Sequence, residues 1–297
     1  MGTDDPCSPV AFVLSSGASL GAAQVGMLLA LLDHGIRPDL VVGCSVGAIN
    51  GAALAEDPTP AGVARLDRLW RTTDGRRIMP GGLRRTVGLA RRTEAVDGTG
   101  TVQDLLAATL TATTFDELAV PFQCVATDVM AETEAWFDRG PLVEAVLASA
   151  AMPGLFPSVQ IGGRRYLDGA IVDDVPVGRA AALGARTLYV LEGGALSRSW
   201  QEPRRPMGSA VQAYWIARRH RFRRALDALP DGVEVHLLPA GEVPRRRFHD
   251  FDGTGELIDA ARVATGAYLC GTAGTGGAAG AAGAATAAPV AAAGGPS

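Results

Sequence analysis

Lysine is absent from this sequence of 297 residues: all 27 basic residues are arginine, against 31 acidic ones, which gives a formal net charge of −4. The absence excludes a P-loop, because that phosphate-binding motif requires a lysine. The net negative charge argues against general binding of nucleic acid, whose phosphates attract basic surfaces. We therefore expect no nucleic-acid partner, although several arginines cluster locally.

Cysteine pairs at metal-binding spacing are also absent. The four cysteines form no C-x-x-C pair and have no metal-ligand spacing with the four histidines. We expect neither a metal ion nor a disulfide framework, and a reducing compartment fits this usage. The cysteines are Cys7, Cys44, Cys124 and Cys270.

Long apolar runs are missing as well. Charged or turn residues interrupt each run well before the ~20 residues that a membrane-spanning helix needs. Residues 1–10 carry two acidic residues and two prolines before the first apolar run, which is not the composition of a signal peptide. We expect a cytoplasmic protein and leave peripheral contact with a membrane open.

Strand-like and helix-like segments alternate along most of the chain, which is typical of an α/β fold. Short apolar runs indicate buried strands, and apolar positions three or four apart indicate helices. We predict a single domain over 8–270, with a mostly parallel central sheet between helices in three layers. The expected strands are 10–14, 39–42, 122–127, 134–137, 187–192 and 233–238, with a hairpin at 159–167 and helices at 22–32, 48–55, 141–151, 210–229 and 254–269.

Two segments do not follow this alternation. Residues 58–115 have helical pieces on either side of an arginine- and glycine-rich stretch with no clear period, and we predict a cap or lid insertion there. Residues 271–297 are almost only Gly, Ala and Thr, so they have too little apolar bulk to offset the entropy of ordering. We predict that this last segment is a disordered tail.

A G-x-S-x-G pattern at 43–47 follows the second expected strand and precedes a helix. The pattern alone is common by chance, but a strand, a sharp turn and a helix are the context that a nucleophilic serine requires. Gly43 and Gly47 allow the backbone to bend so that the Ser45 hydroxyl projects beyond the sheet. The positive end of the next helix favours a developing oxyanion. The alternative is a serine that only caps that helix.

A serine nucleophile needs a base, and the four histidines are poor candidates. His34, His220 and His236 lie at a helix end, in an arginine-rich run and in an alternating strand. Only His249 lies in a loop late enough for the order of an α/β-hydrolase triad. The better candidate is Asp168, at the end of an expected strand and before a glycine, although Asp-Gly also forms ordinary turns.

The small-residue segment Ser15–Gly21 joins the first strand to a helix, so its backbone N–H groups are able to converge on an anion. A dinucleotide fingerprint is absent, because three residues separate Gly17 from Gly21. Neighbouring strands of one sheet would bring this loop beside Ser45.

In this order, the small-residue loop, the G-x-S-x-G turn and the later Asp-Gly-Ala at 168–170 resemble the patatin-like phospholipase family. The similarity is most specific over 13–51 and 125–178. The second region includes A-S-A-A-M-P-G-L-F-P at 148–157, which resembles the family's segment leading to its catalytic aspartate.

The resemblance implies a serine acyl hydrolase that cleaves lipid or simple esters, of the phospholipase A, lysophospholipase or esterase type, through an acyl-enzyme. Ser45 and Asp168 would form a Ser-Asp dyad, and the backbone N–H groups of Gly17 and Ala18 would form the oxyanion hole. No cofactor or metal is implied. A carboxylate of ordinary pKa is a weak base at neutral pH, so we expect burial to raise the pKa of Asp168.

The loop departs from the family's usual Gly-Gly-Gly-x-Arg-Gly, since it reads S-G-A-S-L-G at 16–21. Leu20 supplies no positive charge, so a phosphate headgroup would be less welcome than a neutral ester. Two alternatives stay open: an α/β-hydrolase esterase with a triad of Ser45, Asp168 and His249, and a catalytically silent lipid-binding or scaffold member of the fold. Contact with a membrane would use 58–115 or 214–224, unless their apolar sides pack on the core.

Overall fold

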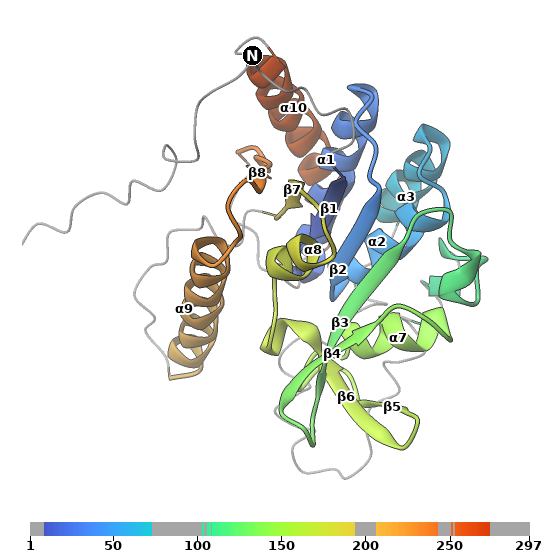
Figure 1. The fold of residues 1–297 in the computed structure, drawn as a ribbon, viewed down its shortest axis with the longest axis vertical. Coiled ribbons are helices and arrows are strands. Elements are labelled where there is room, and N and C mark those ends of the chain that lie inside the picture. The colour runs from blue at the N-terminus through green and yellow to red at the C-terminus, as the bar shows by residue number, and fades with distance from the viewer. Residues whose placement is uncertain are drawn as a thin grey trace, which may run out of the picture.

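Eight strands of the described chain form one sheet, in the order β5-β6-β3-β2-β1-β7-β8 with β4 paired to β3 (Figure 1). The computed structural model describes residues 9–72, 103, 106–107, 109–193, 206–242, 251 and 253–273. Neighbours from β3 to β8 are parallel, whereas β4 and β6 run antiparallel to β3, and β5 to β6. The strands are β1 (Val10–Leu14), β2 (Leu40–Cys44), β3 (Phe122–Asp128), β4 (Thr133–Phe137), β5 (Val159–Ile161), β6 (Arg164–Asp168), β7 (Thr187–Leu191) and β8 (Glu234–Leu237).

Helices cover both faces of the sheet, because its central strands are apolar on both sides. In β1, Phe12 and Leu14 face one helical layer, and Ala11 and Val13 face the other. The first layer is α1 (Gly21–Asp33), α2 (Val46–Glu56), α3 (Pro60–Thr72), α7 (Leu142–Ser149) and α10 (Thr254–Ala273), and the second is α8 (Val177–Ala182) and α9 (Pro206–Asp227). Short 3-10 turns lie at Ala18–Leu20 (η1), Phe115–Glu117 (η2) and Gly169–Ile171 (η3).

The last residues of β2 and β6 meet on one edge of strand β3. Ala126 pairs with Ala135 of β4 and with Asp168 of β6, so these two strands lie on opposite edges of β3. Val125 pairs with Cys44 of β2 and also with β4. Since β4 occupies one edge, β2 and β6 share the other and meet end to end. The last residues of two strands that are far apart in the sequence are therefore neighbours.

The predicted α/β class with a mostly parallel sheet between helices is confirmed. Helix α8 was not expected, because its short run of small residues has no clear apolar period. The segment 58–115 begins with α3, whose Trp70 is buried in the core. Residues 73–102 lie outside the described residues, as do 274–297, so the cap and the tail stay predictions there.

Helix α10 packs closely on α1. A Cβ on Gly26 of α1 would overlap the carbonyl oxygen of Ile258 in α10, so only glycine allows the two backbones to come this near. Met27, Leu31 and Leu257 are fully buried in the same cluster. Helices from the beginning and the end of the described chain therefore form one core.

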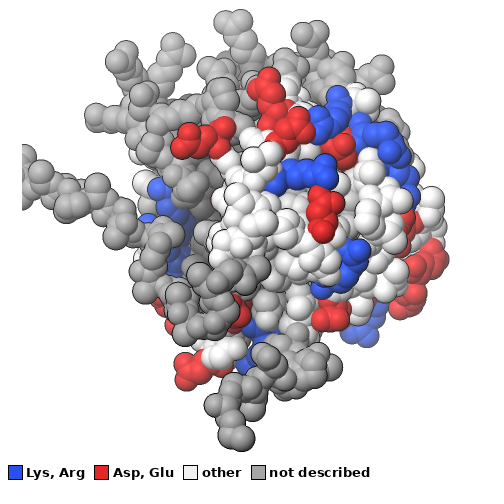
Figure 2. All heavy atoms as spheres, turned by 90° about the horizontal axis from the view of Figure 1, so that it is seen from above, with Lys and Arg blue, Asp and Glu red and all other residues white. Residues whose placement is uncertain are grey.

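Charges of both signs are interspersed on the face seen in Figure 2, without a large patch of one sign. Exposed ion pairs join the outer helices, such as Arg71 with Asp259 at 2.5 Å and Arg262 with Asp33 at 2.7 Å. Exposed pairs of this kind contribute little to stability. Among the residues that the structure describes, none of the helices is both long and apolar enough to cross a membrane.

Candidate active site

Ser45 lies at the turn between β2 and α2, with backbone angles of φ 57° and ψ −122°. A positive φ costs about 1–3 kcal/mol for a residue other than glycine, so the surrounding packing must hold it. A Cβ on Gly43 would overlap the backbone of Gly47, and a Cβ on Gly47 would overlap the carbonyl oxygen of Leu14. The two glycines thus allow the tight turn that presents Ser45 at the N-terminal end of α2.

The Ser45 hydroxyl donates a hydrogen bond of 2.6 Å to Oδ2 of Asp168, and both side chains are buried. Asp168 ends β6, and its Oδ1 accepts the N–H of Ala170 at 2.8 Å. Its carbonyl oxygen accepts the hydroxyl of Thr127 in β3, also at 2.8 Å. One carboxylate oxygen is therefore fixed by the backbone, and the other faces the serine.

Burial raises the pKa of Asp168 to about 6, the direction expected for a carboxylate that acts as a base. The hydrogen bonds from Ser45 and Ala170, followed by the positive charge of Arg218, oppose this rise because they stabilise the charged form. At neutral pH Asp168 is thus mostly ionised, but it binds a proton more strongly than an exposed aspartate does.

The loop between β1 and α1 lies directly against this turn. Gly47 touches the backbone of Leu14 and Ser15, and a Cβ on Gly21 would overlap the Val46 side chain. Within the loop, Ala18 has φ 50°, a left-handed conformation that favours glycine. The segment that holds Gly17 and Ala18 is therefore strained and lies beside Ser45.

A model of the patatin-like phospholipase family matches residues 12–181, which is more than half of the chain. The chain belongs to this family. The match includes the loop at 15–21, Ser45 and Asp168, whereas β7, α9, β8 and α10 lie beyond it.

Curated relatives agree with the family. An uncharacterized NTE family protein of Mycobacterium tuberculosis is 30% identical over 219 residues, which are 73% of this chain and 57% of the relative. The lysophospholipase nte1 of Aspergillus terreus is 26% identical over 214 residues, 69% of this chain and 13% of that protein. This chain thus spans little more than half of the first relative and a small part of the second. Among solved structures, VipD of Legionella pneumophila has 14% identity and a TM-score of 0.47, over 89% of this chain and 67% of VipD.

Ser149, at the end of α7, supports the turn of this patatin-like domain. Its Oγ accepts the backbone N–H of Ser45 at 3.0 Å, and it is fully buried. The N–H at a strained position would otherwise lack a partner, which costs about 1–3 kcal/mol when buried. Sequence reasoning missed this residue, because nothing local distinguishes it from the neighbouring small residues of 148–157.

A chain of buried polar side chains ties the loop to two helices. Gln24 of α1 donates to the carbonyl oxygen of Ser15 at 2.7 Å and accepts from Asn50 of α2 at 2.9 Å. The indole N–H of Trp70 in α3 donates to Asn50 at 2.9 Å. Sequence reasoning missed Gln24 and Asn50 as well, although a polar residue within a largely apolar helix is a signal that could have found them.

Helix α9, beyond the family match, covers the other side of the loop. Leu20, where the family usually has arginine, is buried against Trp215 of α9. Phe222 is buried in the core on the β1–β7 side. Of the apolar residues of 214–224 that we considered for membrane contact, Trp215 and Phe222 therefore pack inside the protein, whereas Tyr214 and Ile216 are exposed. Arg218 of the same helix is also buried.

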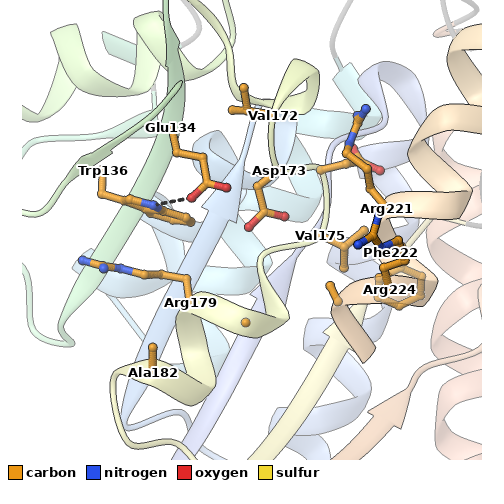
Figure 3. A pocket seen from close by; sticks show the side chains of 13 residues that line it. Glu134, Trp136, Val172, Asp173, Val175, Arg179, Ala182, Arg221, Phe222 and Arg224 are labelled. Carbon is orange, nitrogen blue, oxygen red and sulfur yellow. Dashed lines mark hydrogen bonds between the residues drawn. The ribbon is translucent and has the colours of Figure 1, made fainter. Parts of the chain in front are cut away.

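A pocket of about 510 Å³ lies between β4, α8 and α9 (Figure 3). The carboxylates of Glu134 and Asp173 face one another in it, and burial, followed by Glu134 and Asp174, raises the pKa of Asp173 to about 7. Asp174 separates the pocket from the loop, because its side chain bonds to Ser16. The lining is Glu134, Trp136, Val172, Asp173, Asp174, Val175, Gly178, Arg179, Ala182, Arg221, Phe222, Arg224 and Ala225.

The histidines that the structure describes have other surroundings. His34 bonds to the carbonyl oxygen of Ala30 at 2.8 Å, and His220 is exposed on α9. His236 stacks on Tyr189 in the β7–β8 pair, at the opposite end of the sheet from β6. His249 lies outside the described residues. Within the described ranges, no three His, Cys, Asp or Glu side chains are grouped to hold a metal ion.

Proposed function

We propose that this protein is a serine acyl hydrolase that cleaves lipid esters, with Ser45 as the nucleophile and Asp168 as the base. The observation that carries the proposal is the 2.6 Å hydrogen bond between these side chains at the tight turn after β2. Membership of the patatin-like phospholipase family supports a lipid substrate, and the relative named as a lysophospholipase supports an ester of a lipid.

The proposed reaction has two halves. Asp168 accepts the proton of Ser45 while Oγ attacks the acyl carbon, and the N–H groups of Gly17 and Ala18 hold the oxyanion. The intermediate collapses to the acyl-enzyme, and the leaving alcohol takes the proton from Asp168. Water then gives a proton to Asp168 and attacks the acyl group, which releases the fatty acid and returns the proton to Ser45.

The pH profile alone does not separate this dyad from a triad with His249. With the pKa of Asp168 near 6, activity rises with pH through about 6, which is close to the range in which a histidine titrates, near 6.5. Substitution of the histidine is therefore the sharper test. The dyad predicts that His249→Ala keeps wild-type activity, whereas a triad predicts its loss.

A fluorophosphonate probe tests the nucleophile. We expect labelling of the wild-type protein that is lost in Ser45→Ala and retained in Ser209→Ala, which changes an exposed serine of α9. Absence of labelling in folded wild-type protein would reject the proposal in favour of a catalytically silent member of the family.

A panel of substrates then defines the lipid class. We expect hydrolysis of p-nitrophenyl butyrate and of a lysophospholipid, released fatty acid being the readout. Contact with a membrane surface is a separate proposal, tested by flotation with anionic vesicles at low salt. Activity on the short ester alone would restrict the proposal to an esterase.

A further inference from the structure

Arg218 forms a buried polar cluster with two residues from other parts of the chain. Its Nη2 donates to the hydroxyl of Ser16 at 2.8 Å and to Oδ1 of Asp174. The Ser16 hydroxyl in turn donates to the same carboxylate oxygen. The side chains of Arg218 and Asp174 are only 3% and 2% exposed, so α9 brings a full positive charge into the interior.

Such a pair is a poor device for stability alone. Desolvation of two charges offsets most of their attraction, and apolar replacements of buried pairs are often neutral. Here Oδ2 of Asp174 and Nε of Arg218 also have no hydrogen-bond partner among the described residues, which adds to the cost. The location of the cluster, beside the loop at 15–21, says more about its role than its contribution to stability does.

The cluster holds the residue that precedes Gly17 and Ala18. Ser16 is fixed by its hydroxyl and also by its N–H, which donates to the carbonyl oxygen of Asp174 at 3.2 Å. The strained φ of 50° at Ala18, two residues later, requires firm anchors on both sides. On the far side, Leu20 packs on Trp215, and the Arg218 guanidinium lies 4.1 Å from the centre of the Trp215 ring.

We propose that Arg218 is a positioning residue for the oxyanion loop: through Ser16 and Asp174 it keeps the backbone of Gly17 and Ala18 aimed at the site beside Ser45. It also supplies, from α9, a positive charge near the loop that Leu20 does not supply. This inference rests on the proposed function, and its consequence is that α9 is part of the catalytic unit although it lies outside the family match.

Four variants test it on p-nitrophenyl butyrate. Ser16→Ala removes the side-chain link between the pair and the loop and keeps only the backbone bond from Ser16 to Asp174. Arg218→Met removes the positive charge but leaves Asp174 buried without a cation. The double variant Arg218→Met with Asp174→Asn removes both charges and should fold even where the single variant does not. Arg218→Lys keeps the positive charge, and one ammonium is able to donate to both partners, although it loses the stacking of the guanidinium on Trp215. Arg223→Gln, an exposed arginine of the same helix, is the control.

We expect kcat per folded molecule to fall about tenfold or more in the first three variants, with KM nearly unchanged, because oxyanion stabilisation acts in the transition state. Arg218→Lys should recover part of kcat, because it restores the charge and the hydrogen bonds but not the stacking on Trp215, and Arg223→Gln should match the wild type. The positive charge of Arg218 lowers the pKa of Asp168. The acid limb of the plot of kcat against pH should therefore move to higher pH in Arg218→Met but not in Arg218→Lys.

Hydrogen exchange of the amides at 16–20 gives a readout that does not depend on activity. We expect faster exchange there in Ser16→Ala and in the double variant, with little change in the rest of the sheet. Wild-type kcat and unchanged loop exchange in the folded double variant would overturn the positioning role. If the folded wild-type protein is not labelled by the fluorophosphonate probe, the proposed function is rejected. The exchange data would still decide whether Arg218 holds the loop.

Discussion

The carboxylate of Asp168 lies where its charge is disfavoured, which has a consequence for stability. Its folded pKa of about 6 is above its ordinary value of 3.8, so the folded state favours the protonated form. The resulting cost is absent below pH ~4, grows as the pH rises, and is complete above pH ~7. A shift of about two pKa units corresponds to about 3 kcal/mol.

We therefore predict that Asp168→Asn stabilises the fold while it removes activity. The free energy of unfolding at pH 8 should rise by about 1–3 kcal/mol, because the amide carries no charge and still accepts from Ala170. The gain should vanish near pH 4, and kcat should fall at least about a hundredfold. Urea unfolding at both pH values measures this, with exposed Asp227→Asn as the control. Destabilisation at pH 8 would contradict the assigned cost.

At the same scale, some site residues were visible in the sequence and others were not. The glycines around Ser45 and the glycine after Asp168 meet local requirements of the backbone, so they leave a pattern within a few residues. Ser149 and Arg218 act through contacts across 104 and 202 residues of sequence, and such contacts leave no local pattern. That Ser45 and Asp168 are catalytic stays a prediction.

Among the elements, α2 depends on its closest approach to β1. We predict that Gly47→Ala prevents formation of the turn, because the added Cβ would overlap the carbonyl oxygen of Leu14. Loss of probe labelling and a lower melting temperature are the expected results. Gly178→Ala in α8 is the matched control, since open space surrounds that position, and alanine in a helix should stabilise by about 0.5–1 kcal/mol. A fully active Gly47→Ala protein would argue against a tight turn.

Helix α3 is joined to the loop through the indole of Trp70. We predict that Trp70→Phe lowers the free energy of unfolding by about 1–3 kcal/mol, because the carbonyl oxygen of the buried Asn50 amide loses its donor while most of the ring packing is kept. Urea unfolding measures the loss. Leu69→Ala, at a half-buried position of the same helix, is the comparison for packing alone. If Trp70→Phe costs nothing, the polar chain does not stabilise the loop.

For the whole molecule, the order of elements was predictable because strand and helix periods repeat along the chain. The packing of α10 on α1 was not, because it joins the two ends of the described chain through Gly26 and Ile258. Helix α8, which the sequence did not predict, has only six residues, and these are too few for a helical period to stand out.

We predict that truncation after Ala273 keeps cooperative unfolding and labelling of Ser45, whereas truncation after Glu242 abolishes both. The shorter chain would expose Met27 and Leu31 of α1, which α10 covers. Circular dichroism during heating and the fluorophosphonate probe give the two readouts. A folded, labelled protein that ends at Glu242 would show that α10 is dispensable.

The meeting of β2 and β6 on one edge of β3 makes the candidate site tolerant of changes in chain length elsewhere. Cys44 and Asp168 pair with adjacent residues of β3, so the distance between Ser45 and Asp168 does not depend on how many residues join the end of α3 at Thr72 to the start of β3 at Phe122. The described part of that connection is not free to change, because Leu106, Leu110 and Phe115 are buried in the core. A graft from a relative that replaces 73–102 and keeps these three residues should therefore leave labelling of Ser45 by the fluorophosphonate probe unchanged.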